Sequence, residues 1–212
     1  MGVQERRERE KQARQDAILE AAKEVFFAKG LDQTTIDEIA EAAELSKGTI
    51  YLYFKSKEEL YISVLLRGLD ILIEQFDSLK SHFNQKNAEE LIKEARKIYY
   101  AFYRKYPEFF YIHSLLYHGR IKEKIKPKIL ALTHEKTRQC LIVIAEIIQK
   151  GIDAGTFRDV DPWKTANSFW GAATGIMMML DDEDHQAFIN IPVKELLDYA
   201  TDMLLDSLTR RQ

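Results

Sequence analysis

Polar and basic side chains that could bind a negatively charged partner are concentrated between Leu45 and Lys57. This segment contains three lysines, Lys47, Lys55 and Lys57, and no acidic residue, although the whole chain has a net charge of −3. Hydroxyl groups and a glycine lie among the lysines, so donors, positive charge and a point of close backbone approach occur together. These groups are suited to binding phosphates and the edges of nucleic-acid bases.

Two short helices, at 35–43 and 46–54, are expected to position this segment. Thr35 and Glu38 fit the pattern of a capping box at the start of the first helix. Apolar residues recur at helical spacing, so the two helices can pack together on one face. These apolar residues are Ile36, Ile39, Ala40, Leu45, Ile50 and Phe54. The arrangement predicts a helix-turn-helix, whose second helix enters the major groove of DNA.

Helical periodicity extends through the remainder of the chain, and the alternation typical of strands is nearly absent. We expect a first helix at 9–29, followed by Gly30 as a left-handed C-cap. Ser56 and Glu59 predict a capping box that opens a long helix ending near residue 82. Further helices are expected at 87–105, 108–118, 125–154, 162–181 and 192–209.

The predicted fold class is therefore all-α, with two domains. Residues 1–57 are expected to form a three-helix helix-turn-helix domain that binds DNA. Residues 58–212 are expected to form a larger helical domain for ligand binding and dimerisation.

Two stretches carry a highly specific pattern: GLDQTTIDEIA at 30–40 and LSKGTIYLYFKSKEEL at 45–60. In these stretches the sequence resembles the TetR/AcrR family of bacterial regulators. The resemblance implies that Thr35, Tyr53 and Lys57 contact DNA phosphates. It also implies that Ser46 caps the recognition helix, and that other exposed residues face bases or the sugar-phosphate wall. These other residues are Lys47, Gly48, Thr49 and Tyr51.

Three of these residues also have structural interpretations. Tyr51 could pack in the core, Lys47 could be a solvated surface lysine, and Lys57 could have an exposed structural role. Glu44 departs from the family pattern, which usually has glycine in the turn between the two helices. If that turn needs a positive φ, the side chain of Glu44 costs about 1–2 kcal/mol.

Nine of the chain's twenty-one Tyr and Phe residues lie between Tyr99 and Tyr117. Such a concentration can line an apolar cavity for a small molecule or fill an aromatic core, and the sequence leaves both open. For a cavity, we expect an apolar or aromatic effector to bind and to move the DNA-binding domain through the long helix. The expected lining is Phe76, Tyr99, Tyr103, Phe110, His113 and Tyr117. No cofactor or metal is expected.

Two apolar stripes at three- and four-residue spacing, in the last two helices, predict a four-helix interface in a homodimer. The alternative is that the stripes face the chain's own core. The first stripe is Ala166, Phe169, Trp170, Ala173, Met177 and Leu180. The second is Val193, Leu196, Leu197, Ala200, Met203, Leu204 and Leu208.

No signal-peptide pattern and no apolar run near the ~18 residues of a membrane span are present, and a single cysteine suits a reducing compartment. We therefore expect a cytoplasmic protein without membrane contact.

Enzyme motifs such as a phosphate loop or a zinc-binding helix are absent. A helical interaction protein that has lost DNA binding is the other alternative. The expected function is a ligand-responsive repressor of transcription, which a small-molecule effector releases from a palindromic double-stranded DNA operator.

Overall fold

The computed structural model describes residues 2–107, 109–110, 127–181 and 183–209. Within these ranges every regular element is helical, and the one extended pairing is an isolated bridge between Phe157 and Thr209. The predicted all-α class is confirmed. The helix predicted at 108–118 lies outside the described residues. In the described part of the chain, no helix is both long and apolar enough to span a membrane.

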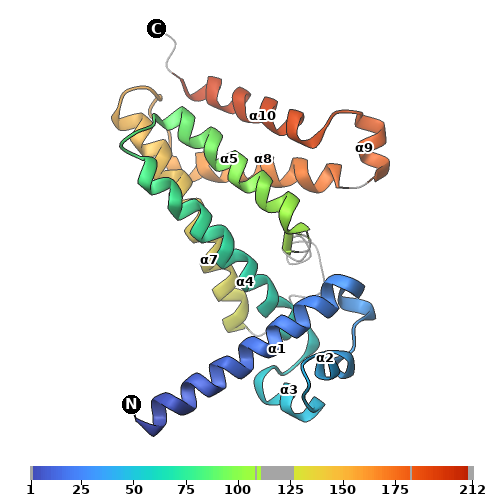
Figure 1. The fold of residues 1–212 in the computed structure, drawn as a ribbon. Helices are drawn as coiled ribbons and strands as arrows, with labels where there is room; N and C mark the ends of the chain where they lie inside the picture. Colours follow the sequence, from blue (N-terminus) through green and yellow to red (C-terminus); the bar gives the residue numbers. More distant parts are fainter. Residues whose placement is uncertain (1, 108, 111–126, 182, 210–212) are drawn as a thin grey trace. The chain divides into compact units, whose positions relative to one another are not determined.

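Internal contacts divide the described chain into two compact units. The first unit lies within 1–68 and 108–133, and the second within 69–107 and 134–212. The first unit contains α1 (Val3–Gln33), α2 (Ile36–Ala42), α3 (Lys47–Tyr53) and the beginning of α4 (Lys57–Ser78) (Figure 1). The domain boundary expected after residue 57 stays a prediction.

The core of the first unit is formed by the apolar faces of its helices. Phe26 of α1 contacts Tyr61 of α4 edge to face, with ring centroids 4.8 Å apart. The other core residues include Ile18, Ala22, Ile39, Ala40, Ile50, Phe54, Leu60 and Val64, all nearly or completely buried. Burial of a large apolar side chain contributes about 1.5–3 kcal/mol, so this cluster holds the short helices α2 and α3 in place.

The predicted capping groups are present at the helix starts of the first unit. The Thr35 hydroxyl accepts a hydrogen bond from the Glu38 N–H at 3.2 Å, and the Glu38 carboxylate accepts one from the Thr35 N–H at 2.9 Å. The Ser56 hydroxyl accepts from the Glu59 N–H at 3.0 Å. The Glu59 carboxylate accepts from the N–H of Lys55 at 3.3 Å.

The first helix is longer than its apolar pattern predicted. It begins at Val3 and not near residue 9, and the apolar stripe could not locate this start because the added residues are exposed. Gly30 has a φ of 73°, which agrees with the positive φ expected there. The chain resumes a helical path after Gly30 as far as Gln33.

The second unit is built from the end of α4 and the helices that follow it. These are the 3₁₀ helix η1 (Leu79–His82), α5 (Ala88–Lys105), α7 (Pro127–Asp153, from residue 134), α8 (Pro162–Leu180), α9 (Glu183–Ile189) and α10 (Val193–Leu208). In Figure 1, α5 and α8 lie beside α10, and α8 packs against both α9 and α10. The sequence did not predict α9, because its acidic start was interpreted as a helix end.

The apolar stripe of α8 contributes mainly to the core of its own unit, whereas most of the α10 stripe is half-buried or exposed. Buried stripe residues are Ala166, Phe169, Trp170, Met177, Leu180, Leu197 and Leu208. Other apolar side chains on these helices and on α9 are exposed: Met179 (39%), Phe188 (87%), Tyr199 (64%) and Met203 (57%). The structure therefore separates core residues from surface residues that the spacing alone could not divide.

The turn between α2 and α3 has a positive φ at a residue other than glycine. Glu44 has a φ of 54°, as its departure from the family pattern anticipated. The N–H of Leu45 donates to the carbonyl oxygen of Ala40 at 2.8 Å and closes the turn. The side chain of Glu44 is exposed, so no packing contact requires it.

Replacing Glu44 with glycine should raise the free energy of unfolding by about 0.5–1 kcal/mol. The steric cost of a left-handed L-residue is about 1–2 kcal/mol, and the additional chain entropy of glycine offsets part of the gain. Urea denaturation measures the change. Glu41→Gly, at an exposed position inside α2, is the control and should lower stability by about 1 kcal/mol. A loss of stability in both variants would contradict the assignment of strain to Glu44.

Candidate nucleic-acid interface and effector pocket

The orientation of α3 is set by one cap and one buried face. The hydroxyl of Ser46 accepts a hydrogen bond from the N–H of Thr49 at 3.1 Å, which is the capping role expected for Ser46. The same hydroxyl lies 2.9 Å from the hydroxyl of Thr49. Ile50 is completely buried and Phe54 nearly so, which turns the other side of α3 outward.

The outward face of α3 carries most of the residues that the sequence assigned to DNA. Lys47, Gly48 and Tyr51 are exposed, whereas Thr49 and Tyr53 are half-buried. The side chain of Tyr51 is 40% exposed, so Tyr51 is not a core aromatic. Leu52 is 76% exposed and was missed by the sequence analysis. Leu52 lies two residues after Ile50 and so not on the same face of α3, and this spacing was the sequence signal that its side chain is exposed.

Gly48 lies where a side chain would meet almost nothing of the protein itself. A Cβ atom added there would have one neighbour, the Ser46 Oγ at 3.7 Å, which is an ordinary van der Waals contact. The fold therefore does not require glycine at this helical position. A glycine at position 48 would instead allow an external partner to approach the backbone closely.

Lys47 forms an ion pair that joins α3 to α2. Its ammonium group lies 2.8 Å from the carboxylate of Asp37, and this hydrogen bond raises the pKa of Lys47. Both side chains are well exposed. Because exposed ion pairs are weak and screened by salt, a DNA phosphate can replace Asp37 as the partner of Lys47 at little cost.

Lys57 holds the chain between α1 and α2. Its ammonium group donates to the carbonyl oxygens of Thr34 at 2.7 Å and of Asp32 at 3.3 Å. This contact corresponds to the structural interpretation of Lys57. An ammonium group has three N–H donors, so these two bonds leave one donor that could reach a phosphate.

Thr35 is exposed at the start of α2, but its polar groups are occupied by the capping box. Its hydroxyl donates to the carboxylate of Glu38 at 3.0 Å. An ion pair with Lys29 and the two donors of Thr35 lower the pKa of Glu38 to about 2. A phosphate at Thr35 would have to displace this ionised carboxylate, so contact of Thr35 with a phosphate stays a prediction.

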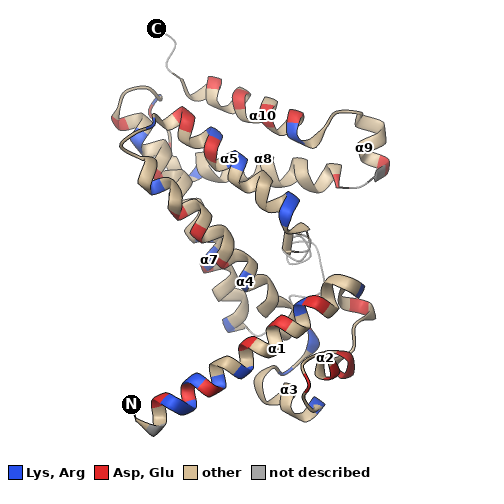
Figure 2. Cartoon of the chain, viewed as in Figure 1, with Lys and Arg blue, Asp and Glu red and all other residues tan. Residues whose placement is uncertain are grey.

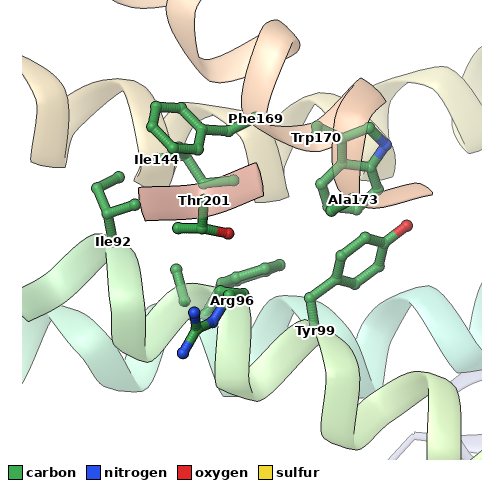
Figure 3. A pocket seen from close by; sticks show the side chains of 10 residues that line it. Ile92, Arg96, Tyr99, Ile144, Phe169, Trp170, Ala173 and Thr201 are labelled. Carbon is green, nitrogen blue, oxygen red and sulfur yellow. The ribbon is translucent and has the colours of Figure 1, made fainter. Parts of the chain in front are cut away.

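The second unit contains a pocket between α5, α8 and α10, with α4 and α7 behind it (Figure 3). Tyr99 of α5 stacks on Trp170 of α8 with ring centroids 4.3 Å apart, and Phe76 of α4 lies 6.3 Å from Trp170. The remaining lining residues are Ile92, Ala95, Arg96, Ile144, Phe169, Ala173 and Thr201. The open space is about 30 Å³, enough for water but far below the roughly 300 Å³ of a small ligand site.

Polar groups of the pocket are paired across its helices. The hydroxyl of Tyr99 lies 2.9 Å from that of Thr174. Arg96 forms an ion pair with Asp198 of α10 at 2.8 Å, and the arginine side chain is only 11% exposed. A ligand entering the pocket therefore meets aromatic rings and one buried cation.

The structure brings together two of the residues predicted to bind an effector. Phe76 and Tyr99 line the pocket. Tyr103 is buried outside this lining and donates to the carboxylate of Asp181 at 2.7 Å. Phe110 is buried and belongs to the first unit. His113 and Tyr117 lie outside the described residues. Trp170 and Arg96 were not predicted as lining, because non-local packing decides which helices meet.

Comparison with known proteins assigns the chain to a family. Residues 18–64 match the family described as bacterial regulatory proteins, tetR family. The HTH-type transcriptional regulator YhgD of Bacillus subtilis is 32% identical over 158 residues, which are 72% of this chain and 76% of YhgD. RutR of Escherichia coli strain K12, another such regulator, is 29% identical over 170 residues, covering 79% of this chain and 75% of RutR.

Solved structures give the same fold. The regulator FadR from Bacillus subtilis, in complex with stearoyl-CoA, superposes with a TM-score of 0.70 at 20% identity, covering 91% of this chain and 98% of FadR. The relatives that match in sequence are HTH-type transcriptional regulators, a class that binds DNA through a helix-turn-helix. The chain belongs to the tetR family of bacterial regulatory proteins. Its family consists of regulators and not of enzymes.

Replacing Gly48 with alanine should stabilise the protein and weaken its binding to DNA. Alanine fits the fold and favours a helix by about 0.8–1 kcal/mol over glycine, but its methyl group would separate α3 from a duplex. Thermal unfolding and a DNA-binding titration give the two readouts. Glu41→Ala, an alanine substitution at an exposed position in α2, is the control. It should change neither the unfolding temperature nor the DNA affinity by much. Unchanged DNA affinity in Gly48→Ala would show that no partner approaches this backbone.

Proposed function

We propose that this protein is a ligand-responsive repressor that binds a palindromic DNA operator as a homodimer and leaves it when an effector binds. The observation that carries the proposal is the outward polar face of α3, opposite the buried Ile50 and Phe54. In a two-fold dimer, two such faces about 34–36 Å apart would meet successive major grooves. A regulator of this kind would act in the cytoplasm.

The proposed DNA contacts are those on and beside α3. Lys47, Gly48, Thr49 and Tyr51 would face the bases or the sugar-phosphate wall, and Ser46 would cap the helix. Thr35, Tyr53 and Lys57 would bind phosphates. The exposure of Lys47, Gly48 and Tyr51 and the weak pairing of Lys47 with Asp37 support this assignment.

The proposed dimer interface uses the outer faces of α8 and α10. Met179, Tyr199 and Met203 are apolar side chains that the chain's own core leaves exposed. Gly171 and Gly175 are exposed on α8, and a Cβ at either position would meet nothing within 4 Å. A second copy of the chain would bury these groups in a four-helix contact.

The proposed effector is a small apolar or aromatic molecule that opens the pocket of the second unit. Aromatic lining at Phe76, Tyr99 and Trp170 supports this chemistry. Because the space is about 30 Å³, entry of an effector requires the rings to separate. Phe76 lies on α4, the helix that begins at Lys57, so a shift of α4 would reach the loop that Lys57 holds. The structurally similar FadR is named as a complex with stearoyl-CoA, an acyl compound, which makes acyl chains one class to test.

Selection of bound fragments from random duplexes should recover a two-fold symmetric site. On it, Thr49→Val should change the base preference, whereas Tyr53→Phe should weaken all sequences alike by a few-fold, because a phosphate contact carries no sequence information. Failure of the wild-type protein to prefer any duplex would refute operator binding. Identical effects of the two substitutions across sequences would refute the division between base and phosphate contacts.

Ala173→Val should reduce effector binding at least tenfold without changing operator affinity. The added methyl groups occupy the pocket, at a packing cost of about 1–3 kcal/mol at most. A thermal-shift screen of aromatic compounds and fatty acids finds the effector, since a ligand that binds the folded state raises the midpoint. Ala172→Val is the matched control on α8, at a half-buried position outside the lining, and should bind normally. An effector that binds both variants equally well would have its site elsewhere.

A further inference from the structure

The first half of α1 projects beyond the part of the chain that matches the family. We call residues 3–17 the N-terminal arm, because the family match begins at residue 18. All described side chains from residue 4 to residue 14 are exposed. The arm therefore contributes almost nothing to the core, and its sequence is free to serve contacts with another molecule.

Charges on the arm are sorted by helical face. Arg7, Lys11 and Arg14 follow one another at four- and three-residue spacing and lie on one face. This face continues the side of α1 on which Ile18 is buried, so the apolar stripe of the core becomes a basic stripe on the arm. Glu5 and Glu8 lie on the other side, and Glu10, three residues after Arg7 and four before Arg14, lies at the edge of the stripe, where it pairs with Arg6. Figure 2 shows Lys and Arg residues alternating with acidic residues along this end of α1.

The three cations of the basic stripe are unpaired within the described part of the chain. Neighbouring cations have partners: Arg6 forms an ion pair with Glu10 at 2.7 Å, and Arg67 of α4 forms one with Asp16. No described residue forms a hydrogen bond or ion pair with any cation of the stripe. Because Glu10 and Asp16 already have partners, and Glu8 forms no described bond with the stripe, the charge of the stripe is available for an external anion.

We propose that the basic stripe of Arg7, Lys11 and Arg14 binds the phosphates of DNA beside the operator half-site read by α3. This inference rests on the proposed function and adds a second, sequence-independent contact to it. The stripe extends over about 10 Å of helix, a length over which one DNA strand presents about three phosphates. Figure 1 shows the N-terminal end of α1 and α3 at the same, lower side of the first unit. A duplex bound by α3 can therefore continue toward the arm.

The test compares the wild-type chain with the triple variant Arg7→Gln, Lys11→Gln and Arg14→Gln. Glutamine retains helix propensity and removes only the charge. Each protein is titrated with the selected operator, with and without about ten flanking base pairs of unrelated sequence, from 50 to 200 mM salt. We expect the flanks to strengthen binding of the wild-type protein only. With two or three phosphate contacts per subunit, and so four to six in the homodimer, the wild-type affinity should also fall about 150- to 1,800-fold more over this salt range than that of the triple variant.

Single substitutions provide the matched control. Arg7→Gln and Arg9→Gln remove the same charge two residues apart, but Arg9 lies on the opposite face of the helix. Only Arg7→Gln should reduce the effect of the flanks and the salt dependence. Equal effects of the two variants, or a triple variant that binds like the wild type, would overturn the arm contact while operator binding stands. So would a triple variant with an altered oligomeric state, because the arm would then bind a second copy. Absence of all operator binding by the wild type would instead refute the proposed function.

Discussion

The two-turn helix α3 depends on tertiary packing for its existence. Seven residues are too few to form a stable helix alone in water, because nucleation is costly and few backbone bonds follow it. Burial of Ile50 and Phe54, together with the Ser46 cap, therefore fixes both the conformation and the outward direction of the polar face. The DNA contacts proposed for α3 rely on this arrangement and on the strained turn at Glu44 that leads into α3.

Local features of the first unit could be predicted from the sequence. A cap such as Thr35 with Glu38 is decided within four residues, so its pattern is visible in the sequence and the structure contains it. The positive φ at Glu44 could be anticipated because the family usually has glycine at this position of the turn. The partners of Lys47 and Lys57 could not be predicted in this way, because Asp37 and Thr34 lie 10 and 23 residues away. Non-local packing selects such pairs.

The second unit shows the same limit more strongly. Aromatic density around Tyr99 predicted a cavity or a core, and the structure contains elements of both, a packed aromatic cluster with a small space beside it. Trp170 joined the lining because α8 packs across α5, which periodicity within one helix does not reveal. Likewise, the spacing of apolar residues in α10 could not separate buried Leu197 from exposed Met203. Periodicity gives the apolar side of a helix but not the identity of its neighbour.

Internal anions next to the groups proposed to bind DNA have an energetic consequence. Asp37 at Lys47 and the ionised Glu38 at Thr35 occupy the groups that a phosphate would use. Binding DNA therefore exchanges one partner for another, and the net gain per contact is smaller than for a free cation. The unpaired cations of the N-terminal arm have no such competitor among the described residues, so the arm and α3 would contribute differently, one to affinity and the other to specificity.

The small volume of the pocket determines how an effector could act. An effector changes the equilibrium between two conformations only by its difference in affinity for them. The described conformation, with Tyr99 stacked on Trp170 and about 30 Å³ of space, offers a larger ligand almost no affinity, so such a ligand must favour a conformation in which the rings are apart. If that conformation also shifts α4, which carries Phe76, it moves the helix whose first residue, Lys57, holds the chain before α2. Linkage is reciprocal, so DNA that prefers the stacked conformation would weaken the effector by the same factor by which the effector weakens DNA.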